Sequence, residues 1–524
     1  MESGHANMAE SPLKRKLQAR HLTMITIGGT IGTGLFLASG GSIAVGGPGG
    51  ALVAYTIIGI MVYFIMTSLG EMASFIPISG SFNTYAKMFV DPALGFALGW
   101  NYWYSWALTV AVEVCAGAII MQYWLPHFPP IVWSFVFLVF ITGLNLFSVR
   151  GYAEAEYWFA MIKGNPLYQV LTVIVFIIIG VLLDVGLIGN PPTKVLGSVF
   201  SNGTFHNGFP GVFTVFLLAS FSFQGTELVG IAAGESKNPE KNIPKAIKQV
   251  FWRILLFYVL AILVIGLLIS YDSPNLLSNE NVAVSPFTLV FLKAGFYGAA
   301  HFMNAVVLTT VLSAGNSGLY ASSRVLYNLA LEGQAPQFFG RLNKNGIPLA
   351  ALFVTAAVSC IVFFAIIFDH SVLYTWLLAL SSVSGMIQWA GISLTHWRFR
   401  RAYIAQQRSL EALPYRASLY PFGPIFAFIL VCIIIAGQGF GIFYSEGLRV
   451  MAIIAAYTGL PIFFILYIGY KVIKKTKLVP LAECDFDRAY QHTKIDNVES
   501  DDDSIDEKDD DKARLWTKAR DVLF

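Results

Sequence analysis

The stretch Ile27-Gly-Gly-Thr-Ile-Gly-Thr-Gly-Leu-Phe36 lies inside the first long apolar segment of the chain. Four glycines within seven residues destabilise an ordinary helix by roughly 1 kcal/mol each relative to alanine. A membrane helix tolerates such a run where helices pack closely, or where the helix is broken and its free N–H and C=O groups face a ligand. The second interpretation predicts a substrate site of a secondary transporter here, and close glycine packing is the alternative.

The composition indicates a membrane protein. Of the 524 residues, 56% are apolar and only 12% are charged, against a usual charged fraction of about a quarter. Many apolar segments reach the roughly 20 residues that a helix needs to cross a bilayer. The four cysteines fit neither a zinc site nor a disulfide framework. We therefore expect an all-α polytopic membrane protein in the cell (inner or plasma) membrane, in contact with the lipid bilayer.

Twelve transmembrane helices are predicted. They lie near residues 22–45, 49–75, 93–121, 129–148, 153–189, 211–234, 250–271, 300–330, 347–368, 371–395, 421–441 and 447–473. The apolar piece 284–297 is too short to cross and predicts a re-entrant or surface helix. The first span follows about 20 polar residues without a signal-peptide cleavage site, which favours a retained span.

Lysine and arginine set the orientation, because cytoplasmic loops are enriched in both. One side carries the basic residues of the N-terminal tail and of alternate loops, including Lys241, Arg324, Arg400 and Lys474. This distribution predicts that both termini are cytoplasmic, in agreement with an even number of spans.

Two tails flank the predicted transmembrane domain, residues 21–475. Residues 1–20 are polar and basic. Residues 476–524 contain a run from Glu499 to Asp511 in which nine of thirteen residues are acidic. Few large apolar residues and dense charge predict disorder. The acidic tail is a solvated extension or, alternatively, a cytoplasmic site for a regulatory partner.

Several chemistries are disfavoured. The chain has no G-x-x-x-x-G-K-[ST] motif, no H-E-x-x-H motif and no zinc-like spacing. No nucleophile–base constellation indicates an enzyme. We expect no cofactor, no metal and no nucleic acid partner. Function must therefore reside in polar groups within the membrane, which are costly there and usually functional.

Two predicted helix breaks would recognise an α-amino acid. The half-helix restarting after Gly32 offers N–H groups and a positive dipole end to a carboxylate. The carbonyls that end the preceding half-helix accept from an ammonium. A second polar interruption, Phe221-Ser-Phe-Gln-Gly-Thr-Glu227, lies in span six. Breaks in spans one and six are the pattern of two inverted five-helix repeats.

Three ionisable residues lie in predicted spans. Glu227 in span six is a functional candidate or, alternatively, a carboxylate that is hydrogen-bonded between helices. Glu113 in span three requires a cationic partner, either the substrate or another helix. Lys163 near the start of span five carries a fixed charge or loses its proton, unless it snorkels to the surface.

Two further groups are candidates for pocket walls. One is an aromatic cluster that lines a pocket or, alternatively, forms an interfacial belt or packs against other helices; its members are Trp100, Tyr102, Trp103, Tyr104 and Trp106. The small polar stretch Ser313-Ala-Gly-Asn-Ser-Gly-Leu-Tyr320 closes the pocket or packs against another helix.

These residues carry a family resemblance. Gly28–Phe36, Phe221–Glu235 and Leu312–Arg324 resemble amino acid permeases of the amino acid–polyamine–organocation superfamily. Longer runs are similar to bacterial lysine-specific permeases; they are Ala19–Met24, Gly95–Tyr104, Ala153–Phe159, Asn242–Ala246 and Phe251–Tyr258. The resemblance covers roughly residues 14–475. It implies a LeuT-type fold of 5+5 inverted repeats (about 22–189 and 211–395), with two extra C-terminal helices at about 421–473.

The resemblance also implies residue roles. The substrate carboxylate would meet the N–H groups of Gly32, Thr33 and Gly34. Its α-ammonium would meet carbonyls of Thr30, Phe221 and Gln224. Glu113 would bind the side-chain ammonium of lysine. The substrate pocket would also include Ser222, Asn316 and Ser317. Proton coupling would involve Lys163 and Glu227.

One departure from the family pattern follows Lys163. Residues Gly164-Asn-Pro-Leu-Tyr-Gln169 look like a short insertion, and Pro166 removes a helix hydrogen bond. Either Lys163 is displaced toward the cytoplasm or the helix kinks around it.

The function expected from the resemblance is secondary active import of L-lysine by proton symport with alternating access. The alternatives are an arginine, histidine or broad-specificity permease, an exchanger, or a membrane nutrient sensor. Because the glycine stretch recognises only the common amino acid end, we expect Glu113 to provide selectivity for lysine.

Overall fold

The computed structural model describes residues 32–78, 81–146, 165–188, 203–231, 233, 236, 238–273, 276, 285–344, 346–440, 453–454 and 456–486. Gly28, Thr30, Lys163, the N-terminal tail and the acidic run at 499–511 lie outside these residues. The predicted roles of these residues therefore stay predictions.

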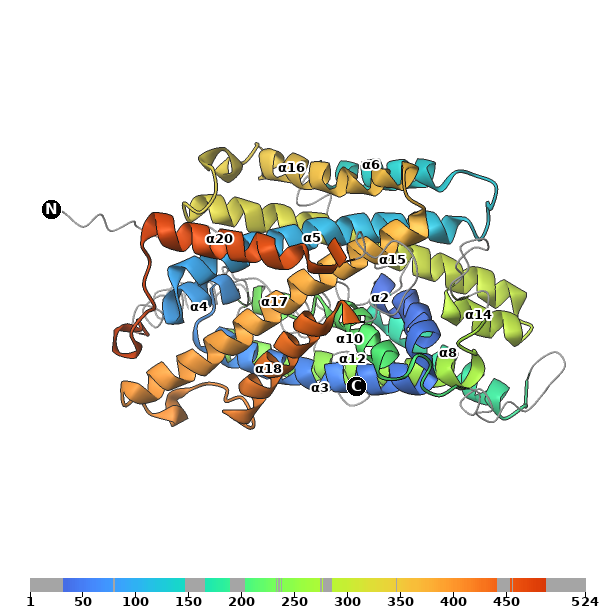
Figure 1. Ribbon diagram of the computed structural model, residues 1–524, viewed down its shortest axis with the longest axis horizontal. Coiled ribbons are helices and arrows are strands. Elements are labelled where there is room, and N and C mark those ends of the chain that lie inside the picture. Colours follow the sequence, from blue (N-terminus) through green and yellow to red (C-terminus); the bar gives the residue numbers. More distant parts are fainter. Residues whose placement is uncertain are drawn as a thin grey trace, which may run out of the picture.

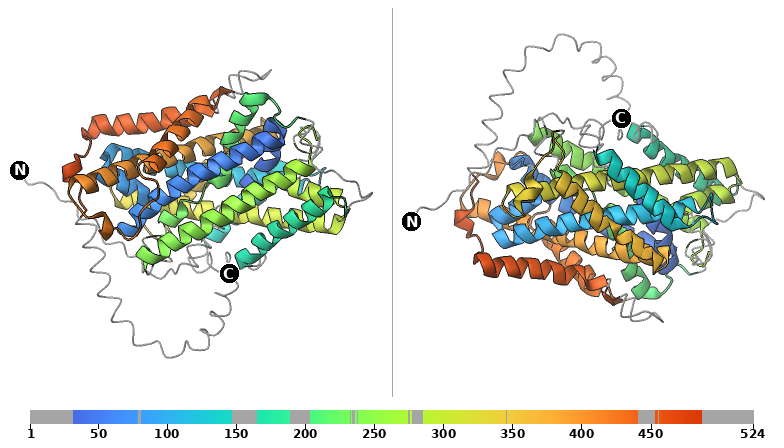
Figure 2. Two further views of the ribbon diagram at one scale, coloured as in Figure 1. Left: turned by 90° about the horizontal axis from the view of Figure 1, so that it is seen from below. Right: turned by 90° about the horizontal axis from the view of Figure 1, so that it is seen from above.

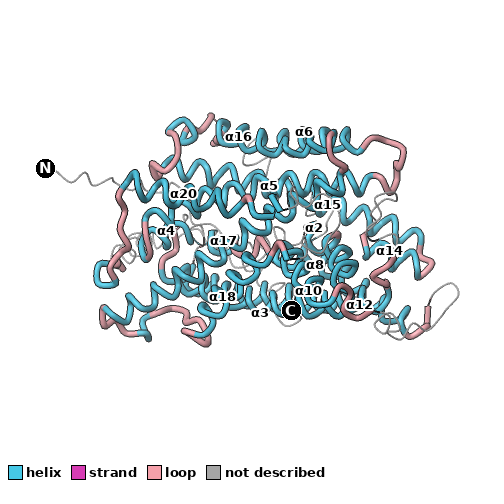
Figure 3. The backbone as a smooth tube through the Cα atoms, in the orientation of Figure 1, coloured by secondary structure: helices cyan, strands magenta, loops and turns pink. Residues whose placement is uncertain are grey.

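The described part of the chain is an all-helical membrane protein with several apolar spans (Figures 1 and 3). Its principal helices are α2 (Thr33–Phe36), α3 (Ala38–Phe75), α4 (Ser81–Phe89), α5 (Pro92–Met121), α6 (Pro130–Leu146), α8 (Asn165–Asp184), α10 (Gly208–Phe223), α11 (Leu228–Ile231), α12 (Pro239–Leu268), α14 (Pro286–Lys293), α15 (Tyr297–Leu331), α16 (Leu349–Ser359), α17 (His370–Ala405), α18 (Phe422–Gly437) and α20 (Gly459–Lys474). Short 3-10 turns lie at Gln337–Gly340, Cys360–Ile366, Leu410–Ala412 and Leu481–Glu483. Six segments in this part of the chain are long and apolar enough to cross a membrane. The predicted short helix within 284–297 is confirmed as α14.

The helices pack in two groups. Helix α3 packs most extensively on α10 and α12, whereas α5 packs most extensively on α15 and α17. We call these the α3 group and the α5 group. Figure 1 shows α3 and α12 along one side of the molecule, α5 and α15 along the other, and α17 crossing between them. Figure 2 shows the same long helices from below and from above, each view at 90° to that of Figure 1.

Both predicted helix breaks coincide with the ends of helices. Helix α2 begins at Thr33, and its N-cap Gly32 has an extended backbone. Helix α10 ends at Phe223, Gln224 is extended and Gly225 has a φ of 93°, a conformation that favours glycine. The chain resumes helical structure at α11. The restart after Gly32 and the interruption of span six are confirmed.

Three predicted boundaries were wrong. Helix α12 begins at Pro239 rather than near residue 250, and α17 continues to Ala405 rather than ending near residue 395. The reason is that hydropathy ends at the membrane surface, whereas lysine, arginine and glutamine continue a helix readily. Arg400 therefore belongs to a helix and is buried, instead of lying in a loop.

The third error concerns the tail. Residues 476–486 were expected to be disordered with the rest of 476–524, but they are ordered against the helices. Six of these eleven residues are apolar, and Cys484 and Phe486 are buried. The prediction missed them because the acidic remainder of the tail dominated the composition of 476–524.

The insertion after Lys163 leaves α8 intact over the described residues. Pro166 is the second residue of α8. The first turn of a helix tolerates proline, because an N–H group there has no intrahelical acceptor.

Candidate functional site

The two helix breaks touch each other. The Ser222 hydroxyl of α10 donates to the carbonyl oxygen of Gly34, at 2.7 Å, and lies 3.0 Å from the Tyr55 hydroxyl. A Cβ atom at Gly34 would lie 2.5 Å from the Cα atom of Ser222. Only glycine permits this approach, so Gly34 serves close packing as well as a broken helix. Ser222 was predicted to contact substrate, but its hydroxyl joins the breaks.

A small cavity lies beside this contact, with a volume of about 30 Å³. Its walls come from both breaks and from α5, α15 and α17. They are Gly32, Gly34, Tyr102, Ser105, Trp106, Thr109, Glu113, Phe221, Gln224, Glu227, Ala314 and Gly385. The volume suffices for a few water molecules, so a larger solute requires the walls to move.

Glu113 lies against the first break. Its Oε1 atom accepts a hydrogen bond from the Thr33 hydroxyl at 3.1 Å. A Cβ atom at Gly32 would lie 2.8 Å from the same oxygen. Glu113 is 3% exposed. The glycine at 32 therefore makes room for a carboxylate, a role that the sequence did not indicate.

Glu227 lies inside the second break. Its two carboxylate oxygens each accept from the backbone N–H of Gly225, at 3.2 Å, and the Trp389 indole donates to Oε2 at 3.4 Å. Glu227 is 4% exposed. Among the described residues, no cationic side chain lies within ion-pair distance of it. Neutral donors hold this carboxylate at the cavity wall.

Gln224 connects the second break to α17. Its side-chain amide donates to the carbonyl oxygens of Ser381 and Ser382, at 3.3 and 3.0 Å. A Cβ atom at Gly385 would lie 2.1 Å from the Gln224 amide nitrogen. The side chain of Gln224 is thus engaged with α17.

Two predicted pocket residues lie apart from the cavity wall. Asn316 on α15 is fully buried, and its Oδ1 accepts from the Asn145 amide of α6 at 2.9 Å. Its neighbour Ser317 does not line the cavity either. The alternative interpretation, helix packing through small polar residues, describes Asn316 better, and Ala314 takes the place at the wall.

The aromatic cluster divides into two parts. Tyr102 and Trp106 line the cavity and pack edge to face, with ring centroids 6.0 Å apart. Trp100 and Trp103 instead donate to the carbonyl of Gln334 and the hydroxyl of Thr355. Tyr102 and Trp106 therefore contribute to the cavity wall, whereas Trp100 and Trp103 contact other parts of the protein. The interfacial belt stays a prediction.

Sequence reasoning missed the contribution of α17. Gly385 and the carbonyls of Ser381 and Ser382 lie at or near the site. The signal was present in Ser381-Ser-Val-Ser-Gly385, a small polar run in an apolar span. Thr109 of α5, which also lines the cavity, lies 2.7 Å from the Ser381 hydroxyl.

Comparison with known proteins adds independent findings. A family model described as amino acid permease matches residues 21–482. The chain is 52% identical to the lysine-specific permease LysP of Escherichia coli (strain K12), over 91% of this chain and 97% of the relative. Two proteins of Lactococcus lactis subsp. cremoris (strain MG1363) are each 48% identical: a lysine-specific permease LysP, over 93% of this chain and 96% of the relative, and the histidine permease HisP, over 91% and 99%.

A solved structure shares the fold. MhsT in complex with L-phenylalanine superposes with a TM-score of 0.54 at 15% identity, over 82% of this chain and 100% of that chain. At this identity the similarity concerns the fold alone.

Proposed function

The chain belongs to the amino acid permease family, and from that premise we propose that it imports L-lysine by proton symport with alternating access. A member of this family is a multi-pass membrane transporter rather than an enzyme. The observation that carries the proposal is the high identity, over nearly the whole chain, to two relatives named lysine-specific permeases.

The proposed architecture has twelve transmembrane helices, with two inverted five-helix repeats followed by two more helices. Breaks at Gly32 and Gly225, in corresponding spans one and six, support the repeats. We place the termini in the cytoplasm from the lysine and arginine distribution. The transporter domain is 21–475, and the tail beyond it offers a site for a regulatory partner.

The common end of the substrate binds at the two breaks in this proposal. The first N–H groups of a helix have no intrahelical acceptor, which leaves those of Gly32, Thr33 and Gly34 for a carboxylate. The carbonyls of Phe221 and Gln224, where α10 ends, accept from the α-ammonium, together with that of Thr30. The Phe221 ring at the cavity wall acts as a gate.

Glu113 binds the side-chain ammonium of lysine. Its carboxylate is buried, lines the cavity and is held by the neutral hydroxyl of Thr33. A charged hydrogen bond to an ammonium is stronger than one to a hydroxyl. The incoming ammonium therefore competes with the Thr33 hydroxyl for Glu113, next to the N–H groups that we propose for the substrate carboxylate.

Glu227 and Lys163 carry the proton coupling. Glu227 lines the same cavity as Glu113 but is fixed by N–H donors of the protein. Among the described residues no cationic side chain pairs with Glu227, and such a buried carboxylate is suited to gain and lose a proton as the cavity changes its exposure. Because the cavity holds only a few waters, the α3 group and the α5 group must separate to admit lysine, which supports alternating access.

A second candidate substrate is L-histidine. The histidine permease HisP is as similar to this chain as one of the two lysine-specific relatives, at 48% identity. The other lysine-specific relative is more similar, at 52% identity, so identity favours lysine, and the competition series below tests histidine.

Purified protein in liposomes tests the proposal. Lysine uptake should follow an imposed inward proton gradient and collapse when the gradient is dissipated. A competition series at two pH values, with lysine, arginine, ornithine, histidine and neutral amino acids, defines the substrate. Stronger competition by histidine than by lysine would replace the lysine assignment, and binding without flux would indicate a sensor.

A further inference from the structure

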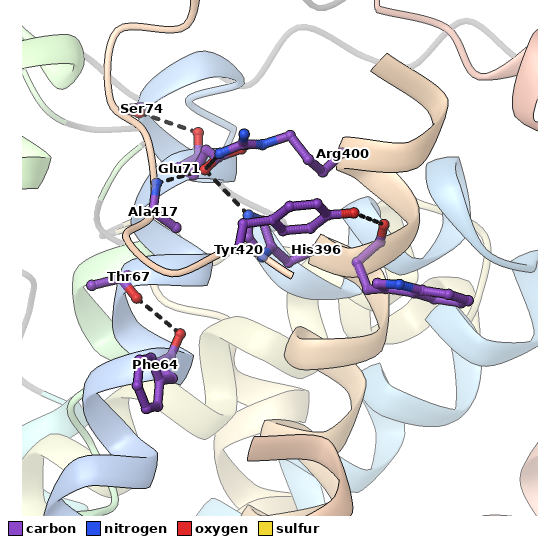
Figure 4. A network of polar contacts seen from close by, with 9 residues as sticks. Phe64, Thr67, Glu71, Ser74, His396, Arg400, Ala417 and Tyr420 are labelled. Carbon is purple, nitrogen blue, oxygen red and sulfur yellow. Dashed lines mark hydrogen bonds and ion pairs between the residues drawn. The ribbon is translucent and has the colours of Figure 1, made fainter. Parts of the chain in front are cut away.

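Another buried glutamate, Glu71 near the end of α3, lies outside the cavity wall, and Figure 4 shows its polar contacts. Glu71 of α3 is fully buried, and Arg400 of α17 donates to its two oxygens from Nε and Nη2, each at 2.5 Å. The backbone N–H of Ala417 donates to the same carboxylate at 2.7 Å, and His396 Nε2 lies 3.3 Å away. Such a fork is the strong, geometrically specific form of an ion pair.

This ion pair joins the two helix groups. Glu71 belongs to α3 and Arg400 to α17, which packs mainly on α5. Arg400 follows the cavity residue Gly385 by 15 residues, about 22 Å along the helix. The pair is therefore not part of the central site, and any separation of the two groups at this end must break it.

The ordered C-terminal segment, residues 476–486, packs over the same end. The Val479 N–H donates to the carbonyl of Val90 at 2.9 Å. Arg398 donates to the carbonyls of Phe89, at 2.7 Å, and Val479. Gln406 donates to the carbonyl of Cys484 at 2.7 Å. These bonds attach the segment to α17 and to the end of α4.

Near the start of this segment, the carboxylate of Asp91 binds two further side chains. Its carboxylate accepts from the Lys471 ammonium and, at 2.8 Å, from the Thr476 hydroxyl. Burial alone would raise the pKa of Asp91, but the hydrogen bonds from Lys471, Ala93 and Thr476 outweigh burial and lower it. The chain therefore enters the C-terminal segment from a fixed, charged anchor.

Phe486 closes the contact between the groups. Its side chain is fully buried. Its ring centroid lies 6.3 Å from that of Phe75, the last residue of α3, and 5.5 and 5.3 Å from Phe399 and Tyr403 of α17. Phe89 completes the cluster at 5.2 Å. Phe486 thus touches both partners that the Glu71–Arg400 pair connects.

We propose that the Glu71–Arg400 pair and the C-terminal segment form a latch that holds the two helix groups together at this end, and that docking of Phe486 controls how often the end opens. When the Glu71–Arg400 pair separates, water enters and solvates both charges, so the ion pair can break and form again repeatedly. The apolar half adds stability through burial of an aromatic ring. The C-terminal segment is then a regulatory element of the transporter.

Cys484 lies within the C-terminal segment and provides a native reporter of docking, because it is only 3% exposed. A background with Cys115→Ala, Cys360→Ser and Cys432→Ser leaves it as the single thiol. Its reaction with a membrane-impermeant maleimide is measured in membrane vesicles of both orientations. Phe486→Ala should accelerate this reaction at least about tenfold, because a buried aromatic anchor is lost. Phe338→Ala is the matched control, since Phe338 is 49% exposed and outside the latch.

A second thiol, placed in the cavity, tests whether docking of Phe486 controls opening of the helix groups or only holds the C-terminal segment in place. In a second background that also carries Cys484→Ser, Ser105→Cys places a thiol at the cavity wall. Phe486→Ala, and independently Arg400→Lys, should increase its labelling from the side on which Cys484 reacts. Neither measurement requires that lysine is the substrate. Faster labelling of Cys484 with unchanged labelling at residue 105 would overturn the latch, as would a Cys484 rate unaffected by Phe486→Ala.

Discussion

Glu71, in α3, and Glu227, in the break between α10 and α11, are both buried glutamates, but their partners differ. Glu71 forms a bidentate ion pair with the guanidinium of Arg400. Glu227 is held by the Gly225 and Trp389 N–H groups. A carboxylate paired with a fixed cation is a permanent structural charge. A carboxylate held only by neutral donors can instead be neutralised by a proton or by a bound substrate cation. The contrast separates the latch from the transport site.

The largest effect is expected from Glu71→Gln. The substitution leaves Arg400 as an uncompensated buried charge, which should reduce the free energy of unfolding by about 3–5 kcal/mol. Thermal unfolding in detergent measures it. The double variant Glu71→Gln with Arg400→Met should regain most of the loss, because no buried charge remains. A melting temperature of Glu71→Gln equal to that of the wild type would mean that the pair is not structural.

Glu113→Gln tests whether the central carboxylates face the substrate. Loss of a charged hydrogen bond should weaken lysine binding by about 1.5–3 kcal/mol, roughly ten- to a hundredfold. Norleucine, which has no side-chain ammonium, should bind both forms alike if the protein accepts it at all. Binding is measured by competition against labelled lysine. An equal loss for lysine and norleucine would contradict the assignment of Glu113 to the ammonium.

Glu227→Gln should change coupling with little effect on folding. One proton per lysine allows about tenfold accumulation for each pH unit across the membrane, which is about 1.4 kcal/mol. In the variant, the accumulation ratio should fall to about one, while lysine exchange across the membrane continues. Accumulation with the pH dependence of the wild type would exclude Glu227 from the coupling. Lys163→Ala, expected to act in the same way, provides a second variant.

The smallest effect is expected from Trp389→Phe, which keeps an aromatic ring and removes one N–H donor to Glu227. The rate of gradient-driven uptake should fall roughly fivefold, which corresponds to an increase of about 1 kcal/mol in the activation free energy. Thermal stability should not change. Trp376→Phe on the same helix is the matched control, because Trp376 packs on Phe368 rather than on a carboxylate. Identical uptake in the two variants would show that the indole N–H has no role in holding Glu227.

The breaks could be predicted because their causes are local. Glycine at 32 and 34, and Gln224-Gly225 in span six, weaken a helix wherever they stand. Membrane burial of Glu113 and Glu227 also followed from the apolar residues around them. The lining by Ser105, Thr109 and Gly385 was not predicted, because small polar residues in a span look alike whether they face a cavity or a helix.

The sequence by itself determined an apolar helical bundle, two interrupted helices and buried carboxylates, since each depends on residues adjacent in the chain. Tertiary structure decided the partners. Glu71 meets Arg400 across 329 residues, and Gly34 meets Ser222 across 188. Local sequence propensities carry no information about contacts between residues so far apart in the sequence. Helix packing alone brings those groups together, and it alone decides that one buried glutamate closes a latch while another lines the cavity.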